Sequence, residues 1–159
     1  MQNNANEMAV FNTAIYVRLS KEDIVAAQSG RESNSITNQK QLILDFLKDK
    51  PEFNIVSIRI DDGYTGTNFD RPAFQRMLND IKVGRINCVV VKDLSRFGRN
   101  YLEAGNYIEK IFPFLGVRFI AVADGFDTGA GGNETKQMVS EIKNLVNDMS
   151  VSYTHLTLP

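Results

Sequence analysis

Four apolar stretches rich in β-branched residues alternate with four segments of helical periodicity along this chain. The apolar stretches cover residues 13–19, 54–60, 86–92 and 117–122. Strands that alternate with helices predict βαβ units, because parallel neighbours need a connection that crosses back over the sheet. The run Cys88-Val89-Val90-Val91 contains no charged residue, which is typical of a central strand covered on both faces. The pattern therefore predicts an α/β fold with a mainly parallel central sheet.

The helical segments have recognisable boundaries. Ser33 or Ser35 is a suitable N-cap for a first helix that continues to about Lys50. Pro72 marks the first turn of a second helix, and Gly84 marks its end. Three apolar stripes with helical spacing predict buried faces: Phe74, Met77, Leu78 and Ile81; Ala104, Ile108, Ile111, Phe112 and Leu115, with a kink or end near Pro113; and Met138, Ile142, Leu145 and Met149.

Two segments, residues 21–32 and 125–133, have no regular pattern. The second contains Gly129-Ala130-Gly131-Gly132 but lacks the spacing of a phosphate-binding loop, so a flexible loop is the better interpretation. We expect residues 1–12 to be a disordered extension and residues 13–149 to form one domain. Residues 150–159 break the helical stripe, which favours a non-native tail of foreign or read-through sequence.

Composition and charge limit the function classes. The chain has 159 residues, enough for one domain with a real core, and a formal net charge of −1. Nucleic-acid affinity is mostly phosphate neutralisation, so this charge argues against tight DNA binding by the chain alone without excluding DNA as substrate. A single cysteine, Cys88, indicates a buried thiol and a reducing cytoplasm. No apolar run is long enough to span a membrane, and the polar N-terminus has no signal-peptide pattern.

The polar residues collect where the predicted strands end, and ligands of open parallel sheets bind at that edge. Strand periodicity places Tyr16, Arg18 and Ser20 on one face of the first strand. If the first and third strands are neighbours, Ser20 and Lys92 flank one crevice. Each residue also has an ordinary alternative: Ser20 as a cap, and Arg18 in a structural ion pair with Asp61 or Asp62.

Arginines around Ser20 favour phosphoryl chemistry. Arg96 and Arg99 are three residues apart and share a face of a helical turn. With Arg18, Arg71 and Lys92 they would form a cationic site suited to a phosphodiester. A Ser-His-Asp hydrolase is poorly supported because the single histidine, His155, lies in the doubtful tail. Metal-dependent hydrolysis is also poorly supported, because Asp61-Asp62 is a weak ligand set. We expect neither a metal nor a cofactor.

The ordered motifs resemble the resolvase/invertase family of serine recombinases, and most closely the large serine recombinases of mobile elements. The resemblance covers roughly residues 14–149. It rests on Tyr16-Val17-Arg18-Leu19-Ser20, Gln39, Asp62-Gly63-Tyr64-Thr65-Gly66, Asp70-Arg71-Pro72, and Lys92-Asp93-Leu94-Ser95-Arg96-Phe97-Gly98-Arg99. The resemblance implies a three-layer α/β/α catalytic domain for site-specific DNA strand cleavage, exchange and rejoining.

The resemblance also implies residue roles. Ser20 would attack the DNA and form a covalent 5′-phosphoserine link. Arg18, Arg71, Arg96 and Arg99 would bind the scissile phosphate, and Tyr16, Gln39, Asp62 and Lys92 would support the site. The implied partners are double-stranded recombination sites and further copies of the chain, as a homodimer and a synaptic homotetramer of the full-length protein.

Two departures from the family pattern affect these expectations. Many members carry an aspartate where this chain has Ser95, so the general acid is left open. The chain also stops near the start of the long dimerisation helix and lacks DNA-binding domains, so we expect little or no activity from the fragment alone. A catalytically silent regulatory or interaction domain of the same fold is the alternative. A nucleotide- or flavin-binding module is a weaker one, because no phosphate-loop signature follows the first strand.

Overall fold

The computed structural model describes residues 10–19, 25, 28, 35–62, 71–98 and 100–129. Five strands form one sheet in the order β2-β1-β3-β4-β5. The strands are β1 (Phe11–Leu19), β2 (Phe53–Asp62), β3 (Cys88–Val91), β4 (Arg118–Ala121) and β5 (Phe126–Asp127). Strands β1 to β4 pair in parallel, and β5 pairs antiparallel with β4. The predicted mainly parallel sheet is confirmed. Strands β1 and β3 are neighbours, which is the condition for Ser20 and Lys92 to flank one crevice.

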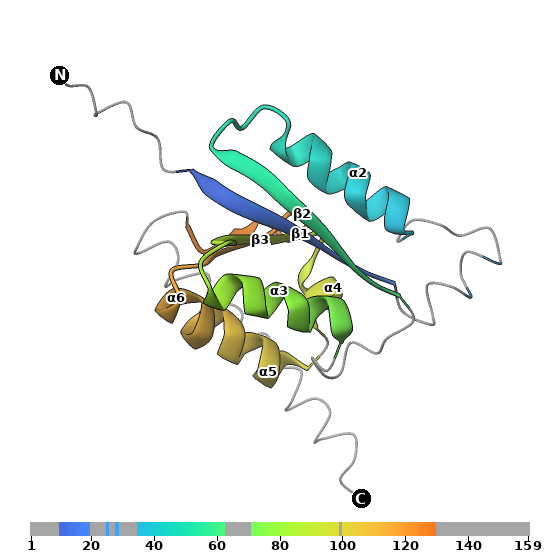
Figure 1. Ribbon diagram of the computed structural model, residues 1–159. Coiled ribbons are helices and arrows are strands. Elements are labelled where there is room, and N and C mark those ends of the chain that lie inside the picture. The colour runs from blue at the N-terminus through green and yellow to red at the C-terminus, as the bar shows by residue number, and fades with distance from the viewer. Residues whose placement is uncertain are drawn as a thin grey trace, which may run out of the picture.

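Helices cover both faces of the sheet (Figure 1). One face is covered by α2 (Ile36–Leu47), which Ser35 caps by accepting the N–H of Asn38. The other face carries α3 (Pro72–Lys82), α4 (Leu94–Phe97) and a continuous helical segment that consists of α5 (Tyr101–Asn106), a π-helical turn (Tyr107–Ile111) and α6 (Phe112–Phe114). The three-layer α/β/α arrangement is therefore confirmed. None of these described helices is both long and apolar enough to cross a membrane.

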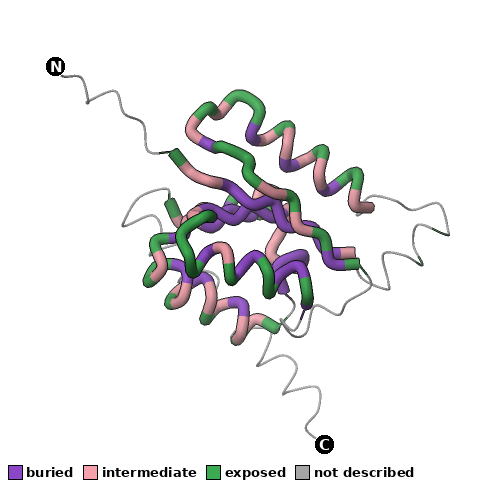
Figure 2. The backbone as a smooth tube through the Cα atoms, viewed as in Figure 1, coloured by how far each residue is buried: buried purple, intermediate pink, exposed green. Residues whose placement is uncertain are grey.

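Alternation along β1 divides the core into two clusters. Ile15 and Val17 pack with Ile43 and Leu47 of α2, whereas Ala14 and Tyr16 pack toward α3 and α5. Figure 2 shows the buried residues in the sheet and on the helix faces that meet it. Because successive strand residues point to opposite faces, Arg18 falls on the α3 side with Tyr16. This alternation determines which helices can reach the candidate site.

Two expectations about the elements need correction, and one is made more specific. Residues 11 and 12 belong to β1 rather than to a disordered extension, because Phe11 pairs with Phe53 and their rings stack at 5.6 Å. The segment expected to be a loop from residue 125 contains β5, which Arg118 anchors by donating to Asp127 at 2.9 and 2.7 Å. The third helix ends at Phe114, close to Pro113 as expected. It accommodates the proline, which has no N–H to continue the ladder, through a π-helical turn at Tyr107–Ile111.

The fourth expected helix, around residues 138–149, lies outside the described residues.

Candidate active site

The site is built at the carboxyl end of β1, next to β3. The order β2-β1-β3 places β1 at the position where the chain switches from one side of the sheet to the other, which is where open α/β sheets bind ligands. Ser20 directly follows the last residue of β1, and Arg99 follows Gly98 after α4. Both residues lie outside the described part of the chain, so their predicted roles rest on their positions in the sequence.

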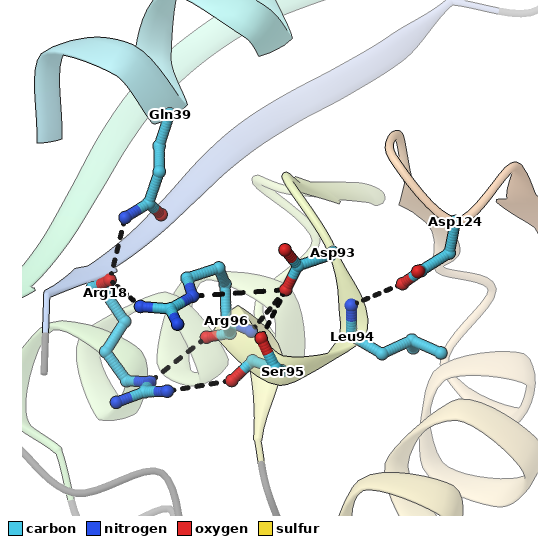
Figure 3. A network of polar contacts seen from close by, with 7 residues as sticks. All are labelled: Arg18, Gln39, Asp93, Leu94, Ser95, Arg96 and Asp124. Atoms are coloured by element: carbon cyan, nitrogen blue, oxygen red, sulfur yellow. Dashed lines mark hydrogen bonds and ion pairs between the residues drawn. The ribbon is translucent and has the colours of Figure 1, made fainter. Parts of the chain in front are cut away.

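Arg18 connects β1 to α4 through both its side chain and its backbone (Figure 3). Its guanidinium donates to the carbonyl of Ser95 at 2.8 Å and to that of Arg96 at 3.4 Å. Its own carbonyl accepts from the Gln39 amide at 3.0 Å and from the Arg96 guanidinium at 3.4 Å. The backbone two residues before Ser20 is thereby held from α2 on one side and α4 on the other.

Helix α4 is short, and two carboxylates determine where it begins. Asp93 is its N-cap and accepts from the Arg96 N–H at 3.0 Å and the Ser95 hydroxyl at 2.6 Å. Asp124, which follows β4, accepts from the Leu94 N–H at 2.7 Å. Both carboxylates act at the helix N-terminus, where the backbone N–H groups and the helix dipole favour negative charge. The Arg96 guanidinium lies 4.0 Å from Asp93, which gives it a nearby opposite charge.

Arg71 approaches α4 from α3, where it is the N-cap residue. It donates to the Phe97 carbonyl at 2.6 Å, and its guanidinium lies 5.5 Å from the Tyr16 ring centre and 5.4 Å from that of Phe74. Burial lowers the pKa of Arg71, while the neighbouring Tyr16 and Asp61 oppose that shift. The carbonyls of residues 95, 96 and 97 thus receive donors from Arg18 and Arg71.

Asp61, on the edge strand β2, joins three parts of the site. The carboxylate accepts from the Tyr16 hydroxyl at 2.8 Å and from the N–H groups of Ala73 and Phe74 at 2.9 and 3.0 Å. Burial, reinforced by Asp61, raises the pKa of Tyr16 far above its ordinary value, so the phenol is neutral. Asp61 is the N-terminal cap that α3 lacks locally, because Arg71 makes no side-chain cap.

This role of Asp61 was not predicted from the sequence, which indicated Asp62 as the supporting residue and Asp61 only as an ion-pair partner or a weak metal ligand. Asp62 is exposed at the end of β2, whereas Asp61 is buried. The available signal was the absence of a capping side chain at position 71, which requires an acceptor from elsewhere in the fold. Arg18 and Asp61 are cross-strand partners, but their hydrogen bonds described above lead to α4 and to α3 respectively.

The structure brings most of the other predicted residues together. Arg18, Arg71 and Arg96 are buried around α4, and Gln39 is buried beneath Arg18. Lys92 directly follows β3 and is half-buried, with its carbonyl accepting from the Ala123 N–H. Guanidinium groups gathered at a strand end are suited to bind the oxygens of a phosphodiester and to stabilise the charge that develops on them during transfer.

Comparison with known proteins identifies the family and the fold. The family model described as the resolvase N-terminal domain matches residues 13–156. The crystal structure of the N-terminal catalytic domain of TP901-1 integrase superposes with a TM-score of 0.70 at 21% identity, covering 89% of this chain and 98% of that one. A resolvase family site-specific recombinase from Streptococcus pneumoniae gives 0.65 at 24% identity, covering 91% and 94%.

A serine recombinase from Sulfolobus solfataricus is more distant, with a TM-score of 0.53 at 17% identity and coverage of 92% and 88%. No curated protein sequence matches the chain. The match to the family model spans nearly all of the sequence, and the solved structures share the fold. The chain therefore belongs to the resolvase family of serine recombinases, which act on DNA.

Proposed function

We propose that this chain is a catalytic domain for site-specific DNA recombination, with Ser20 as the nucleophile. The Ser20 Oγ attacks a backbone phosphorus, the new Oγ–P bond forms, and the bond from phosphorus to the 3′ oxygen breaks. The serine loses its proton and the leaving 3′ oxygen gains one, so the products are a 5′-phosphoserine link and a free 3′ hydroxyl. Attack by a 3′ hydroxyl on the phosphoserine reverses these steps and rejoins DNA without ATP.

The gathering of Arg18, Arg71 and Arg96 directly beside the end of β1 is the observation that carries this proposal. Charge on the non-bridging oxygens has to be stabilised during in-line phosphoryl transfer, and preorganised guanidinium groups do this without reorganising. Ser20 follows the strand that delivers Arg18, and Arg99 follows the helix that delivers Arg96. We assign the four arginines to the phosphate, and Tyr16, Gln39, Asp62 and Lys92 to support of the site.

The proposed partners come from the resemblance to serine recombinases. We propose that the full-length protein acts on double-stranded recombination sites in the cytoplasm, as a homodimer that pairs into a synaptic homotetramer. The net charge of −1 supports reliance on additional DNA-binding domains, because phosphate neutralisation supplies most non-specific affinity.

The decisive experiment measures covalent protein–DNA adducts on nicked suicide substrates, using the full-length recombinase and its recombination site. The wild-type protein should accumulate an adduct and Ser20→Ala should form none, because alanine has no nucleophile. A surviving adduct in Ser20→Ala would assign the attack to another residue. Wild-type protein that binds the site without any adduct would instead favour a silent domain of the same fold.

Arg96→Ala tests the arginine cluster in the same assay. Cleavage should fall by at least about 10²-fold, the scale of losing one donor to a transition-state oxygen. DNA affinity should change far less than the cleavage rate, because the interaction strengthens in the transition state. An unchanged cleavage rate would show that Arg96 only holds the Arg18 backbone.

A further inference from the structure

Asp61 contacts two residues whose rings flank the Arg71 guanidinium. Its carboxylate receives the Tyr16 hydroxyl and the Phe74 N–H. The rings of those same residues lie 5.5 and 5.4 Å from the Arg71 guanidinium carbon. Asp61, a buried side chain on the edge strand, therefore helps to place the two aromatic rings that flank the Arg71 guanidinium.

Asp61 also sets where α3 begins. Arg71 is the residue from which α3 starts, and it provides no cap of its own. The Asp61 oxygens instead receive the N–H groups of Ala73 and Phe74. Without an acceptor, two buried N–H groups in the first helical turn would lose their hydrogen-bond partner, which destabilises that turn. Fraying of that turn would move the Arg71 backbone away from α4.

From these contacts we propose that Asp61 is a positioning residue that holds Arg71 against α4 for catalysis. This inference rests on the proposed function, because it assigns Asp61 an effect on phosphate-directed chemistry through Arg71. Asp61 does not touch the substrate. It acts by capping α3, whose N-cap residue is Arg71, and by fixing the Tyr16 phenol, whose ring lies beside the Arg71 guanidinium. That guanidinium donates to the Phe97 carbonyl.

A double-mutant cycle tests this assignment in the adduct assay. Asp61→Asn keeps the volume of the side chain but removes its charge and replaces one acceptor oxygen with a donor. We expect cleavage to fall by at least about tenfold in the wild-type background. In an Arg71→Ala background the same substitution should change cleavage by less than about twofold, because residues that act through one another are non-additive. Equal losses in both backgrounds, or no loss in the first, would overturn the proposal.

Asp80→Asn is the matched control. Asp80 lies in the same helix and pairs with Arg59 and Arg85, so its substitution removes a charged contact at the far end of α3. Cleavage should be unchanged. A loss equal to that of Asp61→Asn would show that the rate follows general weakening of α3, which contradicts a specific role. If Asp61→Asn does not fold, Tyr16→Phe, which leaves the α3 cap in place and removes only the hydroxyl that Asp61 holds, is measured in the same cycle with the same criteria.

A second measurement separates this inference from the proposed function. Amide hydrogen exchange of Ala73 and Phe74 and the NMR signal of the Arg71 Nε–H are recorded on this chain without DNA. Asp61→Asn should raise exchange at both amides and shift the Arg71 signal, while Asp80→Asn should not. If Asp61 does not position Arg71, the exchange rates and the Arg71 signal should stay unchanged in Asp61→Asn, even when Ser20 is the nucleophile. If Asp61 does position Arg71, both should change, even when Ser20 is not the nucleophile.

Discussion

Three buried arginines share a small volume in this protein, and their burial has to be offset by hydrogen bonds and opposite charge. Arg18 and Arg71 are fully buried and Arg96 is 5% exposed. Backbone carbonyls at the end of α4 accept from Arg18 and Arg71, and Asp93 lies near Arg96. Carbonyl acceptors hold a guanidinium in place without cancelling its charge, which preserves that charge for an anionic substrate.

Cys88 is also buried, and burial favours the neutral form of its thiol. The stability of the fold should therefore depend on pH. Burial raises the pKa of Cys88 from 9.0 to about 12. Between these values the native state keeps a proton that the unfolded state releases. The contribution of the neutral Cys88 thiol to the free energy of unfolding is therefore fully present below about pH 9, and it is lost as the pH rises toward 12.

Urea unfolding at a series of pH values between 8 and 11 should show stability falling with pH, by at most about 1.4 kcal/mol per unit for this one proton. Cys88→Val removes the titrating group and should flatten that slope. The contributions of the Tyr16 and Tyr107 phenols remain, because burial raises the pKa of both. A slope that is the same in both proteins would contradict the buried neutral thiol.

Helix α4 is the element on which the site depends, although it has only four residues. An isolated helix of this length is unstable, because nucleation costs more than one turn can return. Its stability has to come from its contacts: Asp93 and Asp124 at its start, Arg18 and Arg71 at its end, and the Phe97 ring in the core. The site therefore forms only when β1, β3 and β4, which carry or precede Arg18, Asp93 and Asp124, have come together.

Removing the cap from outside the helix tests this dependence. In Asp124→Ala the Leu94 N–H loses its acceptor, and we expect a loss of stability of about 1 kcal/mol, as for other helix caps. Amide exchange at Leu94 should accelerate, while exchange in β1 should follow only the change in global stability. Unchanged exchange at Leu94 would show that the contact with Asp124 does not hold α4 in solution.

Over the whole molecule, an aromatic cluster joins the site to the core on the α3 side of the sheet. The ring centre of Phe97 lies 4.8 Å from Phe119, 5.7 Å from Phe74, 5.8 Å from Phe112 and 6.2 Å from Tyr107. These rings come from β4, α3, α6 and the π-helical turn. Displacement of any of these elements would therefore remove packing contacts from the Phe97 ring and destabilise α4.

Phe97→Ala should destabilise the fold by about 3–5 kcal/mol, because it leaves a large cavity in a packed core. Phe114→Ala is the matched control, since the same substitution at an 88% exposed ring should cost no more than about 0.5 kcal/mol. Chemical denaturation of both variants measures the difference. Similar costs at the two positions would show that the cluster around Phe97 does not support the fold.

Much of this architecture could be predicted from local pattern. The alternation of apolar strands and amphipathic helices predicted the parallel sheet, and the positions of Tyr16 and Arg18 on one strand face agree with the structure. Strand β5 was not predicted, because two residues carry no periodic signal. The π-helical turn was also missed, since Pro113 marks a break in the helix without specifying how the chain accommodates it.

The arginines illustrate where sequence and tertiary structure each contribute. Residue type and motif order indicated Arg18, Arg71 and Arg96 as candidates for a phosphate site, because guanidinium groups suit phosphate oxygens. The structure buries all three. Which oxygens hold those groups could not be predicted, because residues 18, 71 and 96 come together only when β1, α3 and α4 pack.

The role of Asp61 also could not be predicted without the tertiary structure. Adjacent aspartates look alike in sequence, and the direction in which each points depends on the irregular register between β1 and β2 after Thr13. The sequence accounts for the chemistry of the side chains. The packing of three elements decides which of those side chains is buried and what it holds, since burial and long-range hydrogen bonds do not exist until the chain has folded.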